Sequence, residues 1–126
     1  MKTTAKPTPK PLIWVGDSLE MVRTFPEAVK DEPGVALYQA QLGGKHVKAK
    51  PLRDIGFGVM EVVSDHRGDT YRAVYAVRLA DRVYVLHAFQ KKSKTGIATP
   101  KFEIDLIKQR LKRANEIHAA WEKRHG

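Results

Sequence analysis

The chain has 126 residues, a length typical of one compact domain with a single hydrophobic core. Lysine and arginine outnumber aspartate and glutamate by 23 to 14, a formal net charge of +9, so we expect a polyanionic partner. Nucleic acid is favoured over an acidic protein or an anionic membrane surface. The absence of cysteine excludes disulfides, thiolate nucleophiles and cysteine-based zinc sites.

The first eleven residues are rich in lysine, threonine and proline and contain no apolar run. Such a composition buries little apolar surface, so we expect a flexible lead-in over residues 1–11 and a single domain over residues 12–126. No stretch has the length or hydrophobicity of a secretory signal or a membrane span. The prediction is a cytoplasmic protein without a membrane partner.

The first predicted strand covers the apolar run at residues 12–15, and Asp17 or Ser18 is a good N-cap for a following helix. Apolar residues then recur at roughly helical spacing over residues 18–42. Pro26 and Pro33 interrupt this pattern, so two helices or one broken helix fit it equally well.

A basic loop at residues 45–50 precedes a region of β-prone sequence. The predicted strands lie at residues 59–63, 71–77 and 82–89. Their short, polar connections favour an antiparallel meander over a parallel sheet.

After Pro100 the pattern becomes helical again, with an apolar stripe beside a face rich in lysine and arginine. The order of strand, helices, three-stranded meander and helix predicts an α+β fold, which we expect to have its helices on one face of the sheet.

Several short motifs follow one another in a characteristic order. They are Leu52-Arg53, Tyr71-Arg72-Ala73-Val74-Tyr75 and His87-Ala88-Phe89-Gln90-Lys91-Lys92, followed by Pro100 and Glu103-Ile104 at the start of the last helix. In this order they resemble the RelE/HigB toxin superfamily, particularly its phage-associated HigB-like branch, over roughly residues 12–113. The resemblance implies a RelE-like α+β fold with an N-terminal strand and helices, an antiparallel β-meander and a C-terminal helix.

The resemblance also implies a function. Members of this family are toxins of type II toxin-antitoxin systems, typically endoribonucleases that cleave mRNA at the ribosome without a metal or cofactor. An antitoxin neutralises them, and in the HigB branch it is usually a helix-turn-helix protein. Two alternatives stay open: a gyrase-poisoning toxin like those of the ParE branch, and a non-catalytic, phage-derived basic adaptor that binds nucleic acid or protein.

Cleaving RNA without a metal requires a base, cations that stabilise the charge developing on the phosphate, and an acid. The resemblance places Arg72 toward the scissile phosphate, and Lys91 and Lys92 where relatives bind the transition-state phosphate. The alternative for Arg72 is a strand arginine paired with Glu61, and for the lysines it is a solvated basic turn.

His87 is the candidate for proton transfer, because histidine titrates near neutrality. Strand alternation puts it with Val83, Val85 and Phe89, however, so a buried, hydrogen-bonded histidine is the competing and slightly favoured interpretation. No metal site is expected.

The other basic residues of the loops are candidates for binding the RNA backbone. They are Lys48, Lys50, Arg53 and Lys94. One departure from the family pattern matters: Glu61-Val62-Val63 stands where many relatives have Glu-Leu-Arg, so an expected arginine is missing. An acid at the position of Glu61 repels phosphate unless it accepts a proton, and slow or altered cleavage follows as an open alternative.

Overall fold

A computed structural model describes residues 8–91 and 99–125 of the chain. Their elements, in chain order, are β1 (Leu12–Trp14), α1 (Ser18–Arg23), α2 (Glu27–Gln41), β2 (Lys50–Pro51), β3 (Val59–His66), β4 (Asp69–Ala76), β5 (Val83–Lys91) and α3 (Lys101–His125). This order confirms the predicted α+β fold. None of the described helices combines the length and apolar character that crossing a membrane requires.

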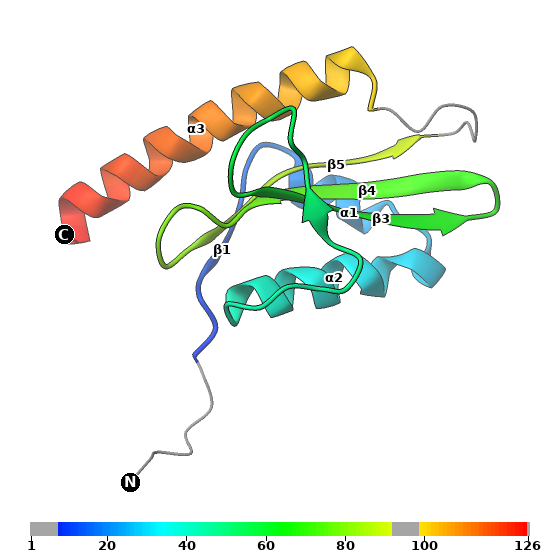
Figure 1. Cartoon of the computed structure of the whole chain (residues 1–126), viewed down its shortest axis with the longest axis horizontal. Coiled ribbons are helices and arrows are strands. Elements are labelled where there is room, and N and C mark those ends of the chain that lie inside the picture. The colour runs from blue at the N-terminus through cyan, green and yellow to red at the C-terminus, as the bar shows by residue number, and fades with distance from the viewer. Residues whose placement is uncertain (1–7, 92–98, 126) are drawn as a thin grey trace, which may run out of the picture.

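The strands form one sheet in the order β1-β5-β4-β3-β2 (Figure 1). Strands β3, β4 and β5 pair antiparallel, so the predicted meander is confirmed. The short strand β1 adds to β5 in parallel at one edge, and β2 pairs antiparallel with β3 at the other.

The meander strands are longer than the sequence predicts, because the connection between β3 and β4 is tight. Only Arg67 and Gly68 form the turn, with φ angles of 52° and 87°. Two successive positive φ angles match the twist of a two-residue hairpin. Ser64, predicted to lie in the turn, is instead a buried strand residue whose Oγ donates a hydrogen bond to Glu32 at 2.5 Å.

The region between β1 and β2 contains two helices, and the chain leaves the helical conformation only near Pro26. Pro33 lies inside α2 without ending it. A proline there removes one backbone hydrogen bond, and burial of Val29, Leu37 and Ala40 against the sheet offsets the loss.

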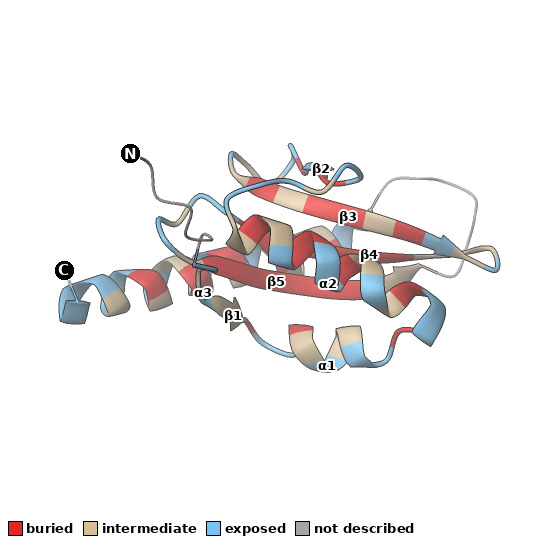
Figure 2. Cartoon of the chain, turned by 90° about the horizontal axis from the view of Figure 1, so that it is seen from below, coloured by how far each residue is buried: buried red, intermediate tan, exposed pale blue. Residues whose placement is uncertain are grey.

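The predicted placement of all helices on one face of the sheet is wrong. Helices α1 and α2 pack against one face and α3 against the other (Figures 1 and 2). Strand β4 explains the error: Ala73 and Tyr75 face α2, whereas Val74 and Ala76 face α3. A strand that is apolar on both sides needs a layer on both sides.

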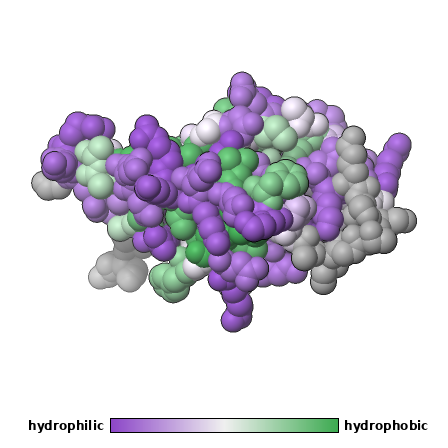
Figure 3. Space-filling view, turned by 90° about the horizontal axis from the view of Figure 1, so that it is seen from above, coloured by the Kyte–Doolittle hydropathy of each residue, from purple (hydrophilic) through white to green (hydrophobic). Residues whose placement is uncertain are grey.

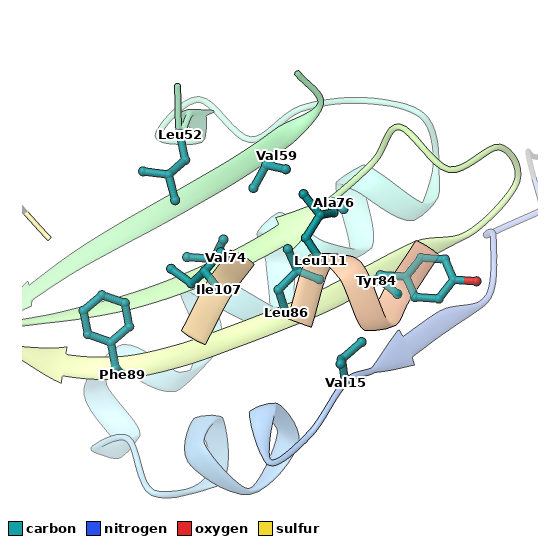
Figure 4. Packing of buried hydrophobic residues seen from close by; sticks show 11 residues of the cluster. Val15, Leu52, Val59, Val74, Ala76, Tyr84, Leu86, Phe89, Ile107 and Leu111 are labelled. Carbon is teal, nitrogen blue, oxygen red and sulfur yellow. The ribbon is translucent and has the colours of Figure 1, made fainter. Parts of the chain in front are cut away.

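The core on the α3 side lies between the sheet and the part of that helix from Ile107 to Ala114 (Figure 4). Ile107 and Leu111 of α3 pack onto Val59, Val74 and Leu86 of the sheet. This cluster holds α3 across the meander, and its position leaves the hairpin end of the same face for polar side chains.

Candidate functional site

A hollow of about 610 Å³ opens on the α3 side of the sheet, toward the hairpin end of β3 and β4. Its walls come from β2, β3 and β4, from Thr99, and from the first turns of α3. The residues that line it are Lys50, Leu52, Asp54, Glu61, Val63, Asp65, Thr70, Arg72, Thr99 and Ile104. Two of the sequence-predicted site residues, Arg72 and Lys50, therefore border the same space.

Arg72 is the central cation of this hollow. Its register partners are Val63 on β3 and Phe89 on β5, and alternation along β4 places its side chain on the same face as Val74. The side chain is buried, and its Nη1 lies 3.4 Å from Oε1 of Glu61 and 3.2 Å from Oγ1 of Thr99. The sheet and the segment before α3 thus hold the guanidinium between a carboxylate and a hydroxyl.

Glu61 is also buried and borders the hollow. Strand β3 places it diagonally across from Arg72, because Glu61 pairs with Val74 and Arg72 pairs with Val63. The sequence analysis gave a pairing of Arg72 with Glu61 as the alternative to a catalytic role for Arg72, and this pair is present. Strand parity accounts for it, since two charged residues on one face of adjacent strands meet.

The hollow has mixed charge. Asp54 and Asp65 add two exposed carboxylates to that of Glu61, against the cations of Arg72 and Lys50. Figure 3 shows that hydrophilic residues cover most of the α3-bearing face, with a hydrophobic band among them. An approaching polyanion therefore meets carboxylates as well as cations at this hollow.

His87 lies on a different face from the one that simple alternation predicts. A register shift in β5 pairs His87 with Val74 but Val85 with Tyr75, so Leu86 is the extra residue of a bulge. The bulge turns His87 and Phe89 toward α3, whereas Val83 and Val85 face α2. The predicted grouping of His87 with those two valines is wrong for this reason.

Both ring nitrogens of His87 are engaged. Nε2 lies 2.5 Å from Oε1 of Glu103, and Nη1 of Arg110 lies 3.0 Å from Nδ1. Since a guanidinium only donates, Nδ1 accepts and Nε2 carries the proton toward Glu103. His87 is buried, and its ring does not line the hollow.

Arg110 extends this contact to the loop between β1 and α1. Its Nη2 lies 2.7 Å from Oδ1 of Asp17, and its Nη1 donates to the backbone oxygen of Leu86. Asp17 precedes α1 but makes no capping hydrogen bond through its side chain, because its carboxylate is directed to Arg110. The network Asp17–Arg110–His87–Glu103 joins the start of α1, the bulge of β5 and the first turn of α3.

None of the other predicted site residues that the structure describes lines this hollow. Lys91 ends β5 opposite Thr70, a residue of the hollow's wall. Lys48 pairs with Glu32 of α2 at 3.1 Å, and Arg53 borders a separate hollow of about 540 Å³ beside Phe57. Lys92 and Lys94 lie outside the described residues.

No group of three or more histidine or carboxylate side chains among residues 8–91 and 99–125 is arranged to hold a metal ion. The metal-independent mechanism stays a prediction, because it concerns the reaction rather than the arrangement of these groups.

Comparison with known proteins places this architecture. Its fold is similar to that of a mutant of the E. coli toxin RelE in which two arginines are replaced by alanine, in the free state. The TM-score is 0.50 and the sequence identity is 20%. The match covers 64% of this chain and 82% of the RelE chain, so the domain has a RelE-like fold.

The family assignment comes from the sequence. Residues 20–112 match the model of the phage derived protein Gp49-like family (DUF891), and the chain belongs to that family. A search of curated proteins found no match.

Proposed function

We propose that this chain is the toxin of a type II toxin-antitoxin system, and that it cleaves mRNA at the ribosome without a metal. The Gp49-like family, the RelE-like fold and the net charge of +9 support the proposal. The observation that carries it is the Arg72–Glu61 pair, held on adjacent strands at the wall of the 610 Å³ hollow.

This pair supplies two of the three groups that the cleavage requires. The Glu61 carboxylate takes the proton of the ribose 2′-hydroxyl, whose oxygen bonds to the neighbouring phosphorus. The bond from phosphorus to the 5′-oxygen breaks, and that oxygen receives a proton. Arg72 stabilises the charge on the phosphate with its planar, bidentate guanidinium.

Two further residues of the β5 end enter the proposal. Lys91, opposite Thr70, is close enough to the hollow to provide a second cation for the phosphate or the proton for the leaving oxygen. The catalytic role of His87 stays a prediction, and the engagement of both its ring nitrogens favours a role in positioning the first turn of α3.

A second candidate function is a non-catalytic, basic adaptor. The observation that favours it is the set of three carboxylates in the hollow, which repel a phosphate backbone unless one of them acts as a base. Poisoning of gyrase is a further alternative, with no feature of the hollow in its favour. A cleavage assay separates the nuclease from both.

The test is single-turnover cleavage of RNA and of mRNA on ribosomes by the purified chain. Arg72→Ala should slow cleavage by about 10²- to 10³-fold, the usual effect of losing one electrostatic contact to the transition state. Arg72→Lys keeps the charge but loses the fork, so its rate should fall between those of Arg72→Ala and the wild type. Arg113→Ala, an exposed arginine of α3, is the matched control and should cut normally.

Because Arg72 is buried, folding must be checked by thermal unfolding of each variant. Glu61→Gln removes the base while retaining its shape, and it should also slow cleavage. If folded Arg72→Ala and Glu61→Gln proteins cut as fast as the wild type, the pair is a structural one. Lys91, Lys92 and His87 then become the remaining candidates.

The toxin assignment has its own test. Expression of the chain alone should arrest growth, and an antitoxin, which the HigB resemblance suggests is a helix-turn-helix protein, should co-purify with the chain and relieve the arrest. Normal growth with abundant folded protein would contradict the assignment.

A further inference from the structure

The guanidinium of Arg110 on α3 is fixed by groups from two other segments. Nη2 lies 2.7 Å from Oδ1 of Asp17, in the loop before α1. Nη1 donates to the Leu86 carbonyl of β5 at 3.2 Å and to Nδ1 of His87 at 3.0 Å. Only 15% of the Arg110 side chain is exposed. Because a planar guanidinium with several partners can satisfy them in one orientation only, Arg110 is a rigid point of the structure.

The backbone beside Arg110 leaves room for this guanidinium. Gly16 has a φ of 59°, in the left-handed region that favours glycine. A Cβ at this position would lie 2.8 Å from Cζ of Arg110, which is too close for atoms that are not bonded. The guanidinium therefore lies against the bare backbone of Gly16, and a side chain there would push it away from its partners.

Arg110 fixes the histidine beside it. Since Nδ1 of His87 accepts from Arg110, Nε2 presents its hydrogen to Oε1 of Glu103. The other constraint is Phe89, on whose ring the imidazole stacks, with the centroids 5.2 Å apart and the planes at 20°. The orientation of the imidazole and the position of its hydrogen thus both depend on Arg110.

His87 in turn anchors the first turn of α3 through Glu103. The N–H groups of Glu103 and Ile104 both donate to the Pro100 carbonyl, so this turn is closed by hydrogen bonds. Thr99 directly precedes Pro100, and a residue in front of a proline is restricted to extended conformations. The place of the Thr99 hydroxyl is therefore set by the turn that Glu103 anchors.

Thr99 meets Arg72 at the wall of the 610 Å³ hollow. Its Oγ1 accepts a hydrogen bond from Nη1 of Arg72 at 3.2 Å, and the same Nη1 lies 3.4 Å from Oε1 of Glu61. A second route runs through Phe89, the register partner of Arg72 on β5, because directly opposite residues have neighbouring side chains. The ring on which His87 stacks is thus a neighbour of Arg72.

We propose that Arg110 is a positioning residue of the candidate site, an inference that rests on the proposed function. Through His87 and the first turn of α3 it holds Thr99, and Thr99 holds the guanidinium of Arg72 in one orientation. Arg110 itself does not line the hollow. A cation stabilises a transition state best when it is already in place, and a displacement of about 1 Å can cost roughly 10²-fold in rate.

A purely structural role for Arg110 predicts a different result. Such a residue would lower the stability of the fold and would slow cleavage only through the fraction of unfolded protein. A positioning residue slows the chemical step in fully folded protein, and it does so only while Arg72 is present. A direct contact with RNA would instead weaken substrate binding.

The first experiment measures the single-turnover rate of RNA cleavage as a function of protein concentration, with folding checked by thermal unfolding. Arg110→Gln and Thr99→Val should each lower the maximal rate by about 10- to 100-fold and change the half-saturating concentration by less than about twofold. Arg113→Gln removes an exposed arginine one turn further along α3, and this control should cut normally. An unchanged maximal rate with a raised half-saturating concentration would overturn the proposal and make Arg110 an RNA contact.

A double-mutant cycle tests whether the effect passes through Arg72. Adding Arg110→Gln to Arg72→Ala should slow cleavage by less than about twofold further, because the contacts that start at Arg110 end at Arg72. If Arg110→Gln slows the Arg72→Ala protein as much as it slows the wild type, Arg110 acts by another route and the proposal is overturned. Should Arg110→Gln fail to fold, Asp17→Asn replaces it, since it weakens only the half-exposed acceptor of Nη2.

The third measurement requires no cleavage. In the folded, ¹⁵N-labelled chain, Arg110→Gln and Thr99→Val should both shift and broaden the Nε–H resonance of Arg72, whereas Arg113→Gln should leave it unchanged. An unaltered Arg72 resonance in folded Arg110→Gln protein would overturn the proposal even if cleavage slowed. If the wild type cuts no RNA, the proposed function fails, and this resonance still decides whether Arg110 positions Arg72.

Discussion

The two faces of the central sheet are built from the same strands but differ in what covers them. On the α2 side, Leu37 packs against Tyr75 and Val85, and the apolar clusters run the length of the face. On the α3 side, the apolar cluster begins at Ile107 in the second turn of α3, and a hollow lined by charged residues takes up the hairpin end. One face provides stability, and the other combines stability with a site.

Strand β4 makes this division visible within a few residues. Ala73 and Tyr75 face the closed side, whereas Arg72 and Val74 face α3. The burial of Tyr75 raises the pKa of its phenol to about 12, so its hydroxyl stays protonated near neutral pH. Since a strand alternates its side chains, a closed face on one side keeps Arg72 in place on the other.

The largest expected effect on stability comes from creating a cavity between α2 and the sheet. Leu37→Ala should lower the free energy of unfolding by about 2–5 kcal/mol, because it removes a buried side chain and leaves a cavity. Urea unfolding measures the change. Val35→Ala on the same helix is the control: Val35 is 50% exposed, and its loss should cost less than about 0.5 kcal/mol. Equal costs for the two variants would refute the packing of α2 on this face.

The architecture could largely be predicted from the sequence, because it depends on local patterns. The meander follows from three β-prone runs with short connections, and the last helix follows from its apolar stripe. The number of covered faces was predictable in principle. Residues 73–77, Ala-Val-Tyr-Ala-Val, form a continuous apolar run, and such a run is typical of a strand covered on both sides.

The candidate site could be predicted only in part. Arg72 and Lys50 came from motif and charge, and the pairing of Glu61 with Arg72 was given as the alternative interpretation. The bulge at Leu86 has no clear local signal, so the face of His87 could not be read from the pattern. Thr99 joins the site through tertiary packing, which periodicity does not describe.

An intermediate effect should come from the network that fastens α3 beside the hollow. Glu103→Ala should cost about 1–3 kcal/mol of unfolding free energy, because it leaves the buried Nε2–H of His87 without its acceptor. Asp105→Ala, which breaks an exposed pair with Lys101 one turn away, should cost less than about 1 kcal/mol.

A double-mutant cycle sharpens this test. If the contact is direct, the costs of Glu103→Ala and His87→Ala should be non-additive, since either substitution removes the same hydrogen bond. Additive costs measured by chemical denaturation would show that the two residues act independently. The first turn of α3 would then depend on other contacts.

The smallest expected effect on stability concerns the contact between α2 and β3 in which Ser64 donates a hydrogen bond to Glu32. The Ser64 hydrogen bond lowers the pKa of the Glu32 carboxyl below its usual 4.5, Lys48 adds to the lowering, and burial opposes it. A carboxyl with a lowered pKa stabilises the fold fully above its unfolded pKa, and this contribution is lost as the pH falls through the folded value. It should therefore be present at neutral pH and disappear below 4.5.

Ser64→Ala should raise the pKa of Glu32 toward its usual value and reduce the loss of stability on acidification. A carboxyl-carbon NMR titration follows the pKa, and urea unfolding at neutral and acid pH follows the stability. Thr24→Ala removes a hydroxyl that donates to the Met21 carbonyl in the α1 region and should leave the Glu32 titration unchanged. If Glu32 titrates normally in the wild type, or identically in Ser64→Ala, the Ser64 hydrogen bond does not hold the carboxylate.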